Sequence, residues 1–314
     1  MRLSQLKIEG FKSYTEPVEV SFDEKISVII GSNGVGKSNA LDAVLWALGE
    51  NDFFKLRCEG YKDLIFSGSN ITDPAQEARV ELTFEANNET FSISRTINEL
   101  GIEKFLVSGK SVSDPNQYKE ALRELGLGNA RISLVRQDEL TNFFSWGSNN
   151  RKQYLEKFIT TQQVLKEVNE LFAQYLDALM PGTSGKLFYD RSNEFVDVEV
   201  VFPDKGCRRG LLLSGGERAS TALALKLALF HTRPSPVYMF DEIEPSLDWT
   251  HGHNMQNLLK RLSQNQQLII VTHFQSTIRM ANTVHGVRIR PDGSSWLKFH
   301  FIMDERLFKI YKCC

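Results

Sequence analysis

The sequence predicts an α/β fold, and three of its features carry that prediction. A run rich in β-branched residues at 26–30 leads into a glycine-rich loop, and residues 39–48 then show the 3.6-residue apolar spacing of a helix. Alternating apolar and polar residues at 78–107 indicate an antiparallel meander with one solvated face. After residue 213, helical and strand-like segments alternate, as they do in a sheet that helices cover.

The remaining elements follow from the same patterns. Residues 3–8 and 18–22 are predicted strands, 118–125 a short helix, and 132–135 a strand that leads into Arg136-Gln137-Asp138. Helical periodicity covers 151–179, with a weak place at 159–162, and the stretch 181–185 ends it. We expect strands at 186–189, 196–202, 237–240 and 268–271, helices after residue 213 and at 246–262, and a strand followed by a short helix at 296–311.

Composition excludes several classes of protein. With 314 residues, of which 41% are hydrophobic and 24% charged, the chain is expected to be globular rather than disordered or fibrous. The formal net charge of -2 gives no overall attraction to nucleic acid. Because no long run of Lys or Arg occurs either, a DNA contact would require a local patch.

Neither a membrane span nor a disulfide framework is expected. No apolar run approaches the roughly 18–20 residues that cross a bilayer, which predicts no membrane partner. The N-terminal residues do not resemble a signal peptide. The four cysteines, Cys58, Cys207, Cys313 and Cys314, are therefore expected to be reduced thiols of a soluble, cytoplasmic protein.

The glycine-rich loop matches the P-loop pattern, Gly31-x-x-x-x-Gly36-Lys37-Ser38, at every fixed position. In this pattern backbone N–H groups converge on phosphate oxygens, Lys37 reaches the β- and γ-phosphates, and the Ser38 hydroxyl coordinates Mg²⁺. The following helix presents its positive N-terminal end to the same anions. A chance glycine-rich turn is the alternative, but it leaves the flanking strand and helix unexplained. ATP and Mg²⁺ are the expected cofactors.

Two further segments suit the chemistry of a P-loop enzyme. The apolar strand 237–240 ends in Asp241, expected to hold Mg²⁺ directly or through water, and Glu242, expected to polarise the attacking water. The strand 268–271 precedes His273, which is expected to contact the γ-phosphate. Taken alone, the acids have a surface pair as their alternative, and the histidine has a structural role.

A second phosphate-binding device is predicted at 213–218, Leu-Ser-Gly-Gly-Glu-Arg. Ser214, Gly215 and Gly216 precede an apolar helical stretch, so they lie at a helix N-terminus, where anions bind. A plain helix cap is the alternative. The combination with a P-loop resembles the ABC-type ATPases, in which the signature of one subunit caps the ATP on the P-loop of another. This resemblance implies a two-fold symmetric dimer that ATP closes and hydrolysis opens.

Four motifs narrow the resemblance: Gly10-Phe-Lys-Ser-Tyr14, Gly34-Val-Gly-Lys-Ser-Asn39, Asp63-Leu-Ile-Phe-Ser-Gly-Ser69 and the signature. In order and spacing they resemble the head domain of the structural maintenance of chromosomes (SMC) family, over nearly the whole chain. The resemblance implies an ABC-type P-loop ATPase head of two lobes with a short coiled-coil stub. The N-terminal lobe would hold a mixed or antiparallel sheet, and the C-terminal lobe a helix-covered sheet.

The resemblance also assigns roles to residues. Lys12 and Ser13 would lie near the phosphates and base, and Gln137 would bind Mg²⁺ and water. Arg57 falls where the family places an arginine linked to DNA-stimulated hydrolysis, and a solvated surface arginine is its alternative. The implied catalytic residues are Glu242, Gln137, His273 and Arg57, and the implied metal ligands are Ser38, Gln137 and Asp241. The implied nucleotide contacts are Lys12, Ser13, Asn33, Gly34, Gly36, Lys37, Ser38, Asn39, Ser214, Gly215, Gly216, Glu217 and, from the D-loop toward the opposite subunit, Asp248.

The chain departs from the family between its lobes. Family members insert a coiled coil and a hinge there, whereas here the outgoing helix at 151–160 is followed at once by what resembles the returning helix at 164–179. We expect a head fragment from which the coil has been removed, or a natural relative without it. Its expected ranges are 1–158 for the N-terminal lobe, 159–185 for the stub and 186–314 for the C-terminal lobe.

The resemblance implies three partners: a second head, a kleisin subunit at the C-terminal lobe, and DNA, the last weakly or indirectly. For the tail at 296–311, docking of a terminal helix on its own core is the alternative to kleisin binding. His251-Gly-His253 has no further ligands at suitable spacing, so it is interpreted as a surface helix rather than a metal site.

Three other functions stay open. The head of a break-repair or recombination ATPase would be distinguished by a zinc-hook Cys-x-x-Cys in its coil. A transport ATPase module would need a surface for membrane-domain helices. An ATP-gated clamp that scarcely hydrolyses ATP is disfavoured by Glu242, whose loss would be the simplest route to such a clamp.

Overall fold

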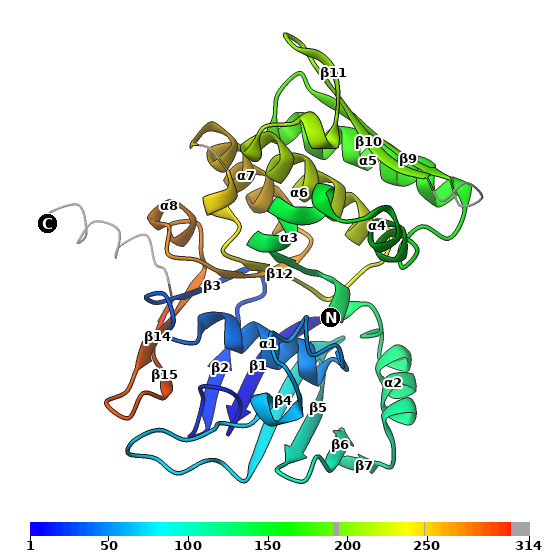
Figure 1. Ribbon diagram of the computed structural model, residues 1–314. Coiled ribbons are helices and arrows are strands. Elements are labelled where there is room, and N and C mark those ends of the chain that lie inside the picture. Colours follow the sequence, from blue (N-terminus) through cyan, green and yellow to red (C-terminus); the bar gives the residue numbers. More distant parts are fainter. Residues whose placement is uncertain (191–194, 248, 303–314) are drawn as a thin grey trace, which may run out of the picture. The chain divides into compact units, whose positions relative to one another are not determined.

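The computed structural model describes residues 1–190, 195–247 and 249–302, which form two compact units (Figure 1). Unit 1 comprises Met1–Ser133, Ser235–Met239 and the described residues from Gln266 onward. Unit 2 comprises Leu134–Pro234 and Phe240–Asn265, except for the positions outside the described ranges. Segments from both ends of the chain therefore build unit 1. The domain ranges predicted from the sequence, 1–158, 159–185 and 186–314, are placed by the motifs rather than by contacts, and they stay a prediction.

The first sheet of unit 1 is antiparallel, with strand order β2-β1-β4-β5-β6-β7. Helix α1 (Lys37–Ala47) lies against β1, β4 and β5 of this sheet (Figure 1). Along β4, buried and more exposed residues alternate, which confirms the meander with one wet face. The strands are β1 (Arg2–Glu9), β2 (Val18–Ser21), β4 (Glu77–Ala86), β5 (Glu89–Asn98), β6 (Glu103–Val107) and β7 (Lys110–Val112).

The second sheet of unit 1 contains the strand before the P-loop. Here β3 (Ile26–Ile30) pairs in parallel with both β13 (Gln267–Val271) and β14 (Thr283–Ile289), and β14 pairs antiparallel with β15 (Ser295–Ile302). The order is β15-β14-β3-β13-β12, with β12 at Val237–Asp241. Continuous apolar runs such as β13 are fully buried, as expected of parallel strands covered on both faces. Unit 1 also contains α2 (Pro115–Glu124) and α8 (Gln275–Ile278).

Unit 2 packs helices beside a three-stranded antiparallel sheet, β11-β10-β9. Its buried centre is α6 (Gly215–His231), which contacts both α3 (Gln137–Asn142) and α5 (Gln162–Leu179). The other elements are β8 (Leu134–Arg136), α4 (Ser148–Leu155), β9 (Ser184–Asp190), β10 (Phe195–Phe202), β11 (Gly206–Arg209) and α7 (Trp249–Leu262). Short 3-10 helices occur at Tyr61–Leu64 and Ala130–Ile132 in unit 1, and at Phe143–Ser145, Gly210–Leu212 and Glu244–Ser246 in unit 2.

The helical periodicity predicted over 151–179 is realised as two helices. The chain leaves α4 at Leu155 and starts α5 at Gln162, where the Thr161 side chain caps the new helix by accepting from the backbone N–H of Val164. Helix α5 packs on β9, α6 and α7, and buries Val168, Phe172, Leu176 and Leu179. Helix α5 lies within 159–185, the segment predicted to hold the coiled-coil stub, and that prediction stays open.

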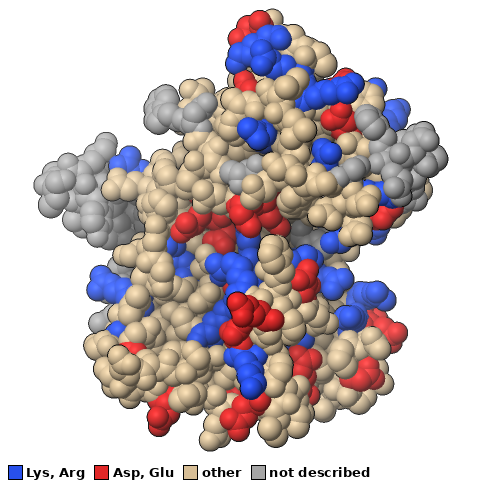
Figure 2. All heavy atoms as spheres, in the orientation of Figure 1, with Lys and Arg blue, Asp and Glu red and all other residues tan. Residues whose placement is uncertain are grey.

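Several further expectations can be placed on the structure. Cys58 is half-buried and Cys207 exposed, both as free thiols, whereas Cys313 and Cys314 lie outside the described residues, as does the tail beyond Ile302. Among the described residues, no helix combines the length and apolar character needed to cross a membrane. On the face drawn in Figure 2, basic and acidic side chains occur side by side. The net charge of -2 is therefore small because positive and negative side chains nearly cancel.

Candidate nucleotide site

The P-loop connects the buried strand β3 to α1, as the sequence predicts. Gly36 is the N-cap of α1 and has φ 96°, a left-handed conformation that glycine adopts without strain. A Cβ atom at Gly36 would lie 2.2 Å from Ser295 Oγ and 2.6 Å from Ser13 Oγ. The turn is therefore compatible only with glycine at this position. Asn33 and Gly34 are exposed at the tip of the loop, and Ser38 is half-buried in the first turn of the helix.

Lys37 is folded into the loop that precedes it. Its Nζ atom donates hydrogen bonds to the carbonyl oxygens of Gly31 and Ser32, both at 2.9 Å, and the residue is only 4% exposed. Backbone carbonyls of the loop thus hold the ammonium group at the N-terminal end of α1. This arrangement adds a full positive charge to the partial charge of the helix terminus.

A cluster of hydroxyl and amide groups ties the N-terminal Phe-Lys-Ser motif to the same turn. Asn39 Nδ2 donates to Ser13 Oγ at 2.8 Å, and Ser295 Oγ bonds to Ser13 Oγ at 2.6 Å and to the carbonyl of Val35 at 2.7 Å. The buried Tyr14 hydroxyl donates to the carbonyl of Gly36 at 3.0 Å, and burial raises the pKa of that phenol. The P-loop turn is thereby braced from residues 10–14 and from β15.

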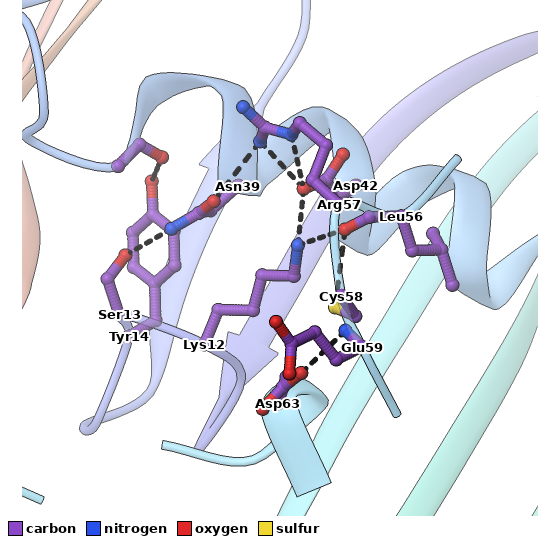
Figure 3. A network of polar contacts seen from close by, with 11 residues as sticks. Lys12, Ser13, Tyr14, Asn39, Asp42, Leu56, Arg57, Cys58, Glu59 and Asp63 are labelled. Atoms are coloured by element: carbon purple, nitrogen blue, oxygen red, sulfur yellow. Dashed lines mark hydrogen bonds and ion pairs between the residues drawn. The ribbon is translucent and has the colours of Figure 1, made fainter. Parts of the chain in front are cut away.

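Asp42 joins two residues that the sequence assigned to the site (Figure 3). It is fully buried on α1, and its Oδ2 accepts from Lys12 Nζ at 2.6 Å and from Arg57 Nη2 at 2.7 Å and Nε at 3.2 Å. Lys12 also donates to the carbonyl of Leu56, and Arg57 Nη2 donates to Asn39 Oδ1 at 3.2 Å. One carboxylate therefore holds two cations beside the first turn of α1, and the group as a whole keeps a net positive charge.

A second buried arginine fixes the root of the loop that carries Arg57. Arg95 of β5 donates to the backbone carbonyls of Trp46 at 2.9 Å and Glu50 at 3.1 Å, and to Asn51 Oδ1 at 2.7 Å. Its guanidinium also lies 4.8 Å from the centre of the Trp46 ring and pairs with Glu103. Trp46 lies near the end of α1, and Glu50 and Asn51 lie at the start of the loop that follows. Arg95 therefore fixes the direction in which the chain leaves α1 before Arg57 reaches Asp42.

Sequence reasoning missed Asp42 and Arg95. For Asp42 a signal existed, because it is an acid within the buried stretch Ala40–Leu48, where a charge needs a partner. Cys58 directly follows Arg57 in the chain, and its thiol bonds to the carbonyl of Leu56 at 3.3 Å. Burial raises the pKa of that thiol, although Lys12 opposes the shift.

In unit 2, the two acids lie where the sequence predicts. Asp241 is the last residue of β12 and is buried, and Glu242 follows it half-buried. Glu242 has φ 50°, a left-handed conformation that costs a non-glycine residue on the order of 1–3 kcal/mol. Such strain clusters at functional sites, which agrees with the role predicted for this carboxylate.

The other predicted site residues of unit 2 that the structure describes also lie at the ends of helices or strands. Gln137 is the first residue of α3, as expected for a side chain presented at the end of a strand, β8. Ser214 is the exposed N-cap of α6, and Gly215 begins the helix at a place where an added Cβ atom would meet no other group within 4 Å. Asp248, predicted to contact an opposite subunit, lies outside the described residues.

The signature forms a capping box. Ser214 Oγ accepts from the N–H of Glu217 at 3.4 Å, and Glu217 Oε2 accepts from the N–H of Ser214 at 2.8 Å. Lys205 Nζ also donates to Glu217 Oε1 at 2.8 Å. Burial alone would raise the pKa of Glu217, but Lys205 and the Ser214 donors outweigh it and lower that pKa. Glu217 therefore stabilises the start of α6, and its role as a nucleotide contact stays a prediction.

The structure brings together Lys12, Ser13, Asn39 and Arg57 at the P-loop turn, and Ser214 and Glu217 at the signature. His273 lies exposed after β13 in unit 1, with its ring centre 4.6 Å from that of Phe274. No group of three or more His, Cys, Asp or Glu residues with metal-binding geometry occurs in the described ranges. The histidines predicted to be a surface feature, His251 and His253, lie on α7.

Comparison with known proteins decides the family. The family described as RecF/RecN/SMC N terminal domain matches residues 2–295. The chain belongs to this family. Its ABC-type α/β fold is that of the SMC head: a crystal structure of an Smc head bound to the C-winged helix domain of ScpA has a TM-score of 0.86 and 26% identity, covering 98% of this chain and all of that one. The SMC head domain from Thermotoga maritima is 30% identical, with a TM-score of 0.70 and coverage of 97% and 100%.

Curated relatives of this SMC head are much longer proteins. The chromosome partition protein Smc of Mesomycoplasma hyorhinis is 31% identical over 319 residues, which covers 86% of this chain but 32% of the relative. A second Smc, from Xanthomonas oryzae, is 35% identical over 167 residues, covering half of this chain and 14% of the relative. The chain thus spans about a third or less of these relatives.

Proposed function

We propose that this chain is an ATP-binding and ATP-hydrolysing head of an SMC-type chromosome partition protein. The observation that carries the proposal is the pair of separate anion-binding helix starts, Gly36-Lys37 on α1 in unit 1 and Ser214-Gly215 on α6 in unit 2. Two such devices in one chain suit a nucleotide sandwiched between two copies, with the signature of each closing the P-loop of the other. ATP then favours the closed dimer, and hydrolysis releases it.

The residues present fit ATP with Mg²⁺. Oxygen donors of the kind that Mg²⁺ prefers are supplied by the Ser38 hydroxyl, the Asp241 carboxylate and the Gln137 amide. Mg²⁺ bound together with ATP would neutralise charge on the β- and γ-phosphate oxygens. Lys37, released from the loop carbonyls, adds positive charge at the same phosphates, and the net positive group around Asp42 adds more.

Hydrolysis is assigned to Glu242, with Gln137 and His273 in support. A carboxylate directly after the buried end of β12 orients the attacking water and accepts its proton. Gln137 positions the water from the start of α3, and His273 senses the γ-phosphate. Asp248 contacts the second copy, and the nucleotide contacts are those predicted from the motifs.

The partners proposed are a second head, a kleisin and DNA. A kleisin is proposed because a similar Smc head has been crystallised with the C-winged helix domain of ScpA. DNA is proposed as a weak or indirect partner whose effect on hydrolysis passes through Arg57. A role in chromosome partition would place the protein in the cytoplasm. The head of a related break-repair ATPase is the second candidate, because the matching family also includes RecF and RecN.

Hydrolysis measured over a series of protein concentrations tests the proposal. If a second copy completes each site, the rate per molecule rises with concentration, and Ser214→Arg lowers it at least about tenfold while ATP still binds. The matched control is Ser113→Arg, a serine of unit 1 outside the proposed site, which is expected to leave the rate unchanged. A rate per molecule that is independent of concentration and unaffected by Ser214→Arg would reject the sandwich.

A further inference from the structure

A charged side chain lies inside the signature helix. The run Ala219–Phe230 of α6 is apolar except for two small hydroxyl residues and Lys226, and Lys226 is only 1% exposed. A lysine at this depth destabilises a fold unless its charge is paired. The groups that contact Lys226 therefore indicate its role.

Lys226 is held by two other helices of unit 2. Its Nζ atom forms an ion pair with Oε2 of Glu139, on α3, and lies 5.3 Å from the centre of the Tyr154 ring, on α4. Burial raises the pKa of Tyr154 well above its usual value, so the phenol stays neutral. Glu139 is thus the anion that balances Lys226, and its side chain keeps 28% exposure.

The pair joins the two helices that begin with predicted site residues. Glu139 is in the first turn of α3, two residues after Gln137, which is proposed to bind Mg²⁺ and water. Lys226 belongs to α6, which begins at the signature. Helices α3 and α6 are also packed against each other. A displacement of α3 would break the pair or carry α6 with it.

We propose that Lys226 and Glu139 are positioning residues that couple α3 to α6, so that Mg-ATP engaged by Gln137 sets the signature for a second head. The proposal rests on the proposed function. Packing alone does not require the charge, because replacing a buried ion pair by apolar residues of similar volume is often neutral or stabilising. The pair supplies instead one strongly preferred arrangement of the two helices, as buried ion pairs do where they specify a conformation.

Substitution of Lys226 by methionine separates these roles, since it removes the charge and keeps an apolar stem of similar length. The partly exposed Glu139 remains solvated in this variant, so we expect it to fold. In a Glu242→Gln background, the dissociation constant of the dimer in Mg-ATP is measured by light scattering. We expect Lys226→Met to raise it about tenfold, a change typical of coupling between sites. The affinity of the monomer for ATP should change less than about twofold, and in otherwise native protein kcat should fall with KM unchanged.

Two further variants make the result specific. Lys166→Met removes an exposed lysine of α5, 72% accessible, and should leave the dimer constant unchanged. If Lys226 acts through Glu139, the double variant Lys226→Met with Glu139→Gln should behave like Lys226→Met alone, whereas independent roles give additive losses.

The outcomes distinguish this inference from the proposed function. A dimer constant for Lys226→Met equal to that of its Glu242→Gln parent, or additive effects in the double variant, would overturn the coupling and leave the sandwich intact. A parent that stays monomeric in Mg-ATP rejects the sandwich, and the inference is rejected with it. If Lys226→Met does not fold, Glu139→Gln decides by the same readout, with an unchanged dimer constant contradicting the coupling.

Discussion

The guanidinium of Arg57 is bound to the carboxylate of Asp42, with Nη2 and Nε both donating to Oδ2, at 2.7 and 3.2 Å. Arg57 has φ 54°, a left-handed conformation that is uncommon for an arginine. The backbone at Arg57 therefore adopts an unfavourable conformation, and this conformation places the side chain against α1, where the Asp42 carboxylate accepts its hydrogen bonds. The proposed roles of Arg57 and Lys12 both depend on this single acid.

We predict that Asp42→Asn destabilises the protein by about 3–5 kcal/mol, because it leaves the buried ammonium of Lys12 without its counter-charge. The free energy of unfolding in urea measures this. Glu81→Gln is the control, since it breaks the more exposed pair with Arg79 and should cost less than about 1 kcal/mol. Equal losses for the two variants would show that Asp42 does not balance Lys12.

Arg57→Ala should act on function more than on stability, because the Arg57 side chain is 43% exposed. We expect a loss of ATP affinity much smaller than that of Lys37→Ile, and a smaller increase of the hydrolysis rate on adding DNA. The rate with and without duplex DNA checks this at low salt, where phosphate contacts are strongest. An undiminished response to DNA would identify Arg57 as a structural partner of Asp42 and nothing more.

Lys37→Ile is predicted to abolish ATP binding, since the loop then lacks the ammonium group that the carbonyls of Gly31 and Ser32 hold in place. Titration with a fluorescent ATP analogue measures the loss, expected to exceed about a hundredfold. Lys62→Ile, at an exposed lysine of the same unit, serves as the control. Retained binding in the Lys37 variant would overturn the P-loop assignment.

The signature capping box predicts a pH dependence. The pKa of Glu217 is lowered in the folded protein, so its contribution is present above the pKa of an unfolded glutamate and disappears as the pH falls through the folded value. At pH 7, Glu217→Gln should cost about 1 kcal/mol, and this difference should shrink as the pH falls through the folded value. Thermal unfolding of both proteins over a series of decreasing pH values checks this, and a difference independent of pH would mean that the charge of Glu217 contributes nothing.

Local patterns predicted most elements because each depends on a few neighbouring residues. The P-loop strand and helix, the meander before Val107 and the capping box at Ser214 all follow from alternation, helical spacing or a cap. The break between α4 and α5 was visible as a weak place near Thr161.

Contacts between distant residues were not predictable from local pattern. Nothing near Asp42 in the sequence indicates Lys12, 30 residues earlier, or Arg57, 15 later, and nothing near Trp46 indicates Arg95. A buried charge such as Asp42 or Lys226 does signal that a partner exists, but only the fold says which one. The division into units was hidden for the same reason, because β13 and β14 pair with a strand some 250 residues earlier in the chain.

Two copies of the chain are proposed to close around ATP, and the solution mass of Glu242→Gln tests this most directly. This variant keeps the fold and the phosphate-binding groups but lacks the carboxylate proposed to activate water, so bound ATP persists. Light scattering should give the mass of a monomer, 35.8 kDa, without nucleotide and twice that mass with Mg-ATP. A monomer under both conditions, with ATP bound, would contradict the account.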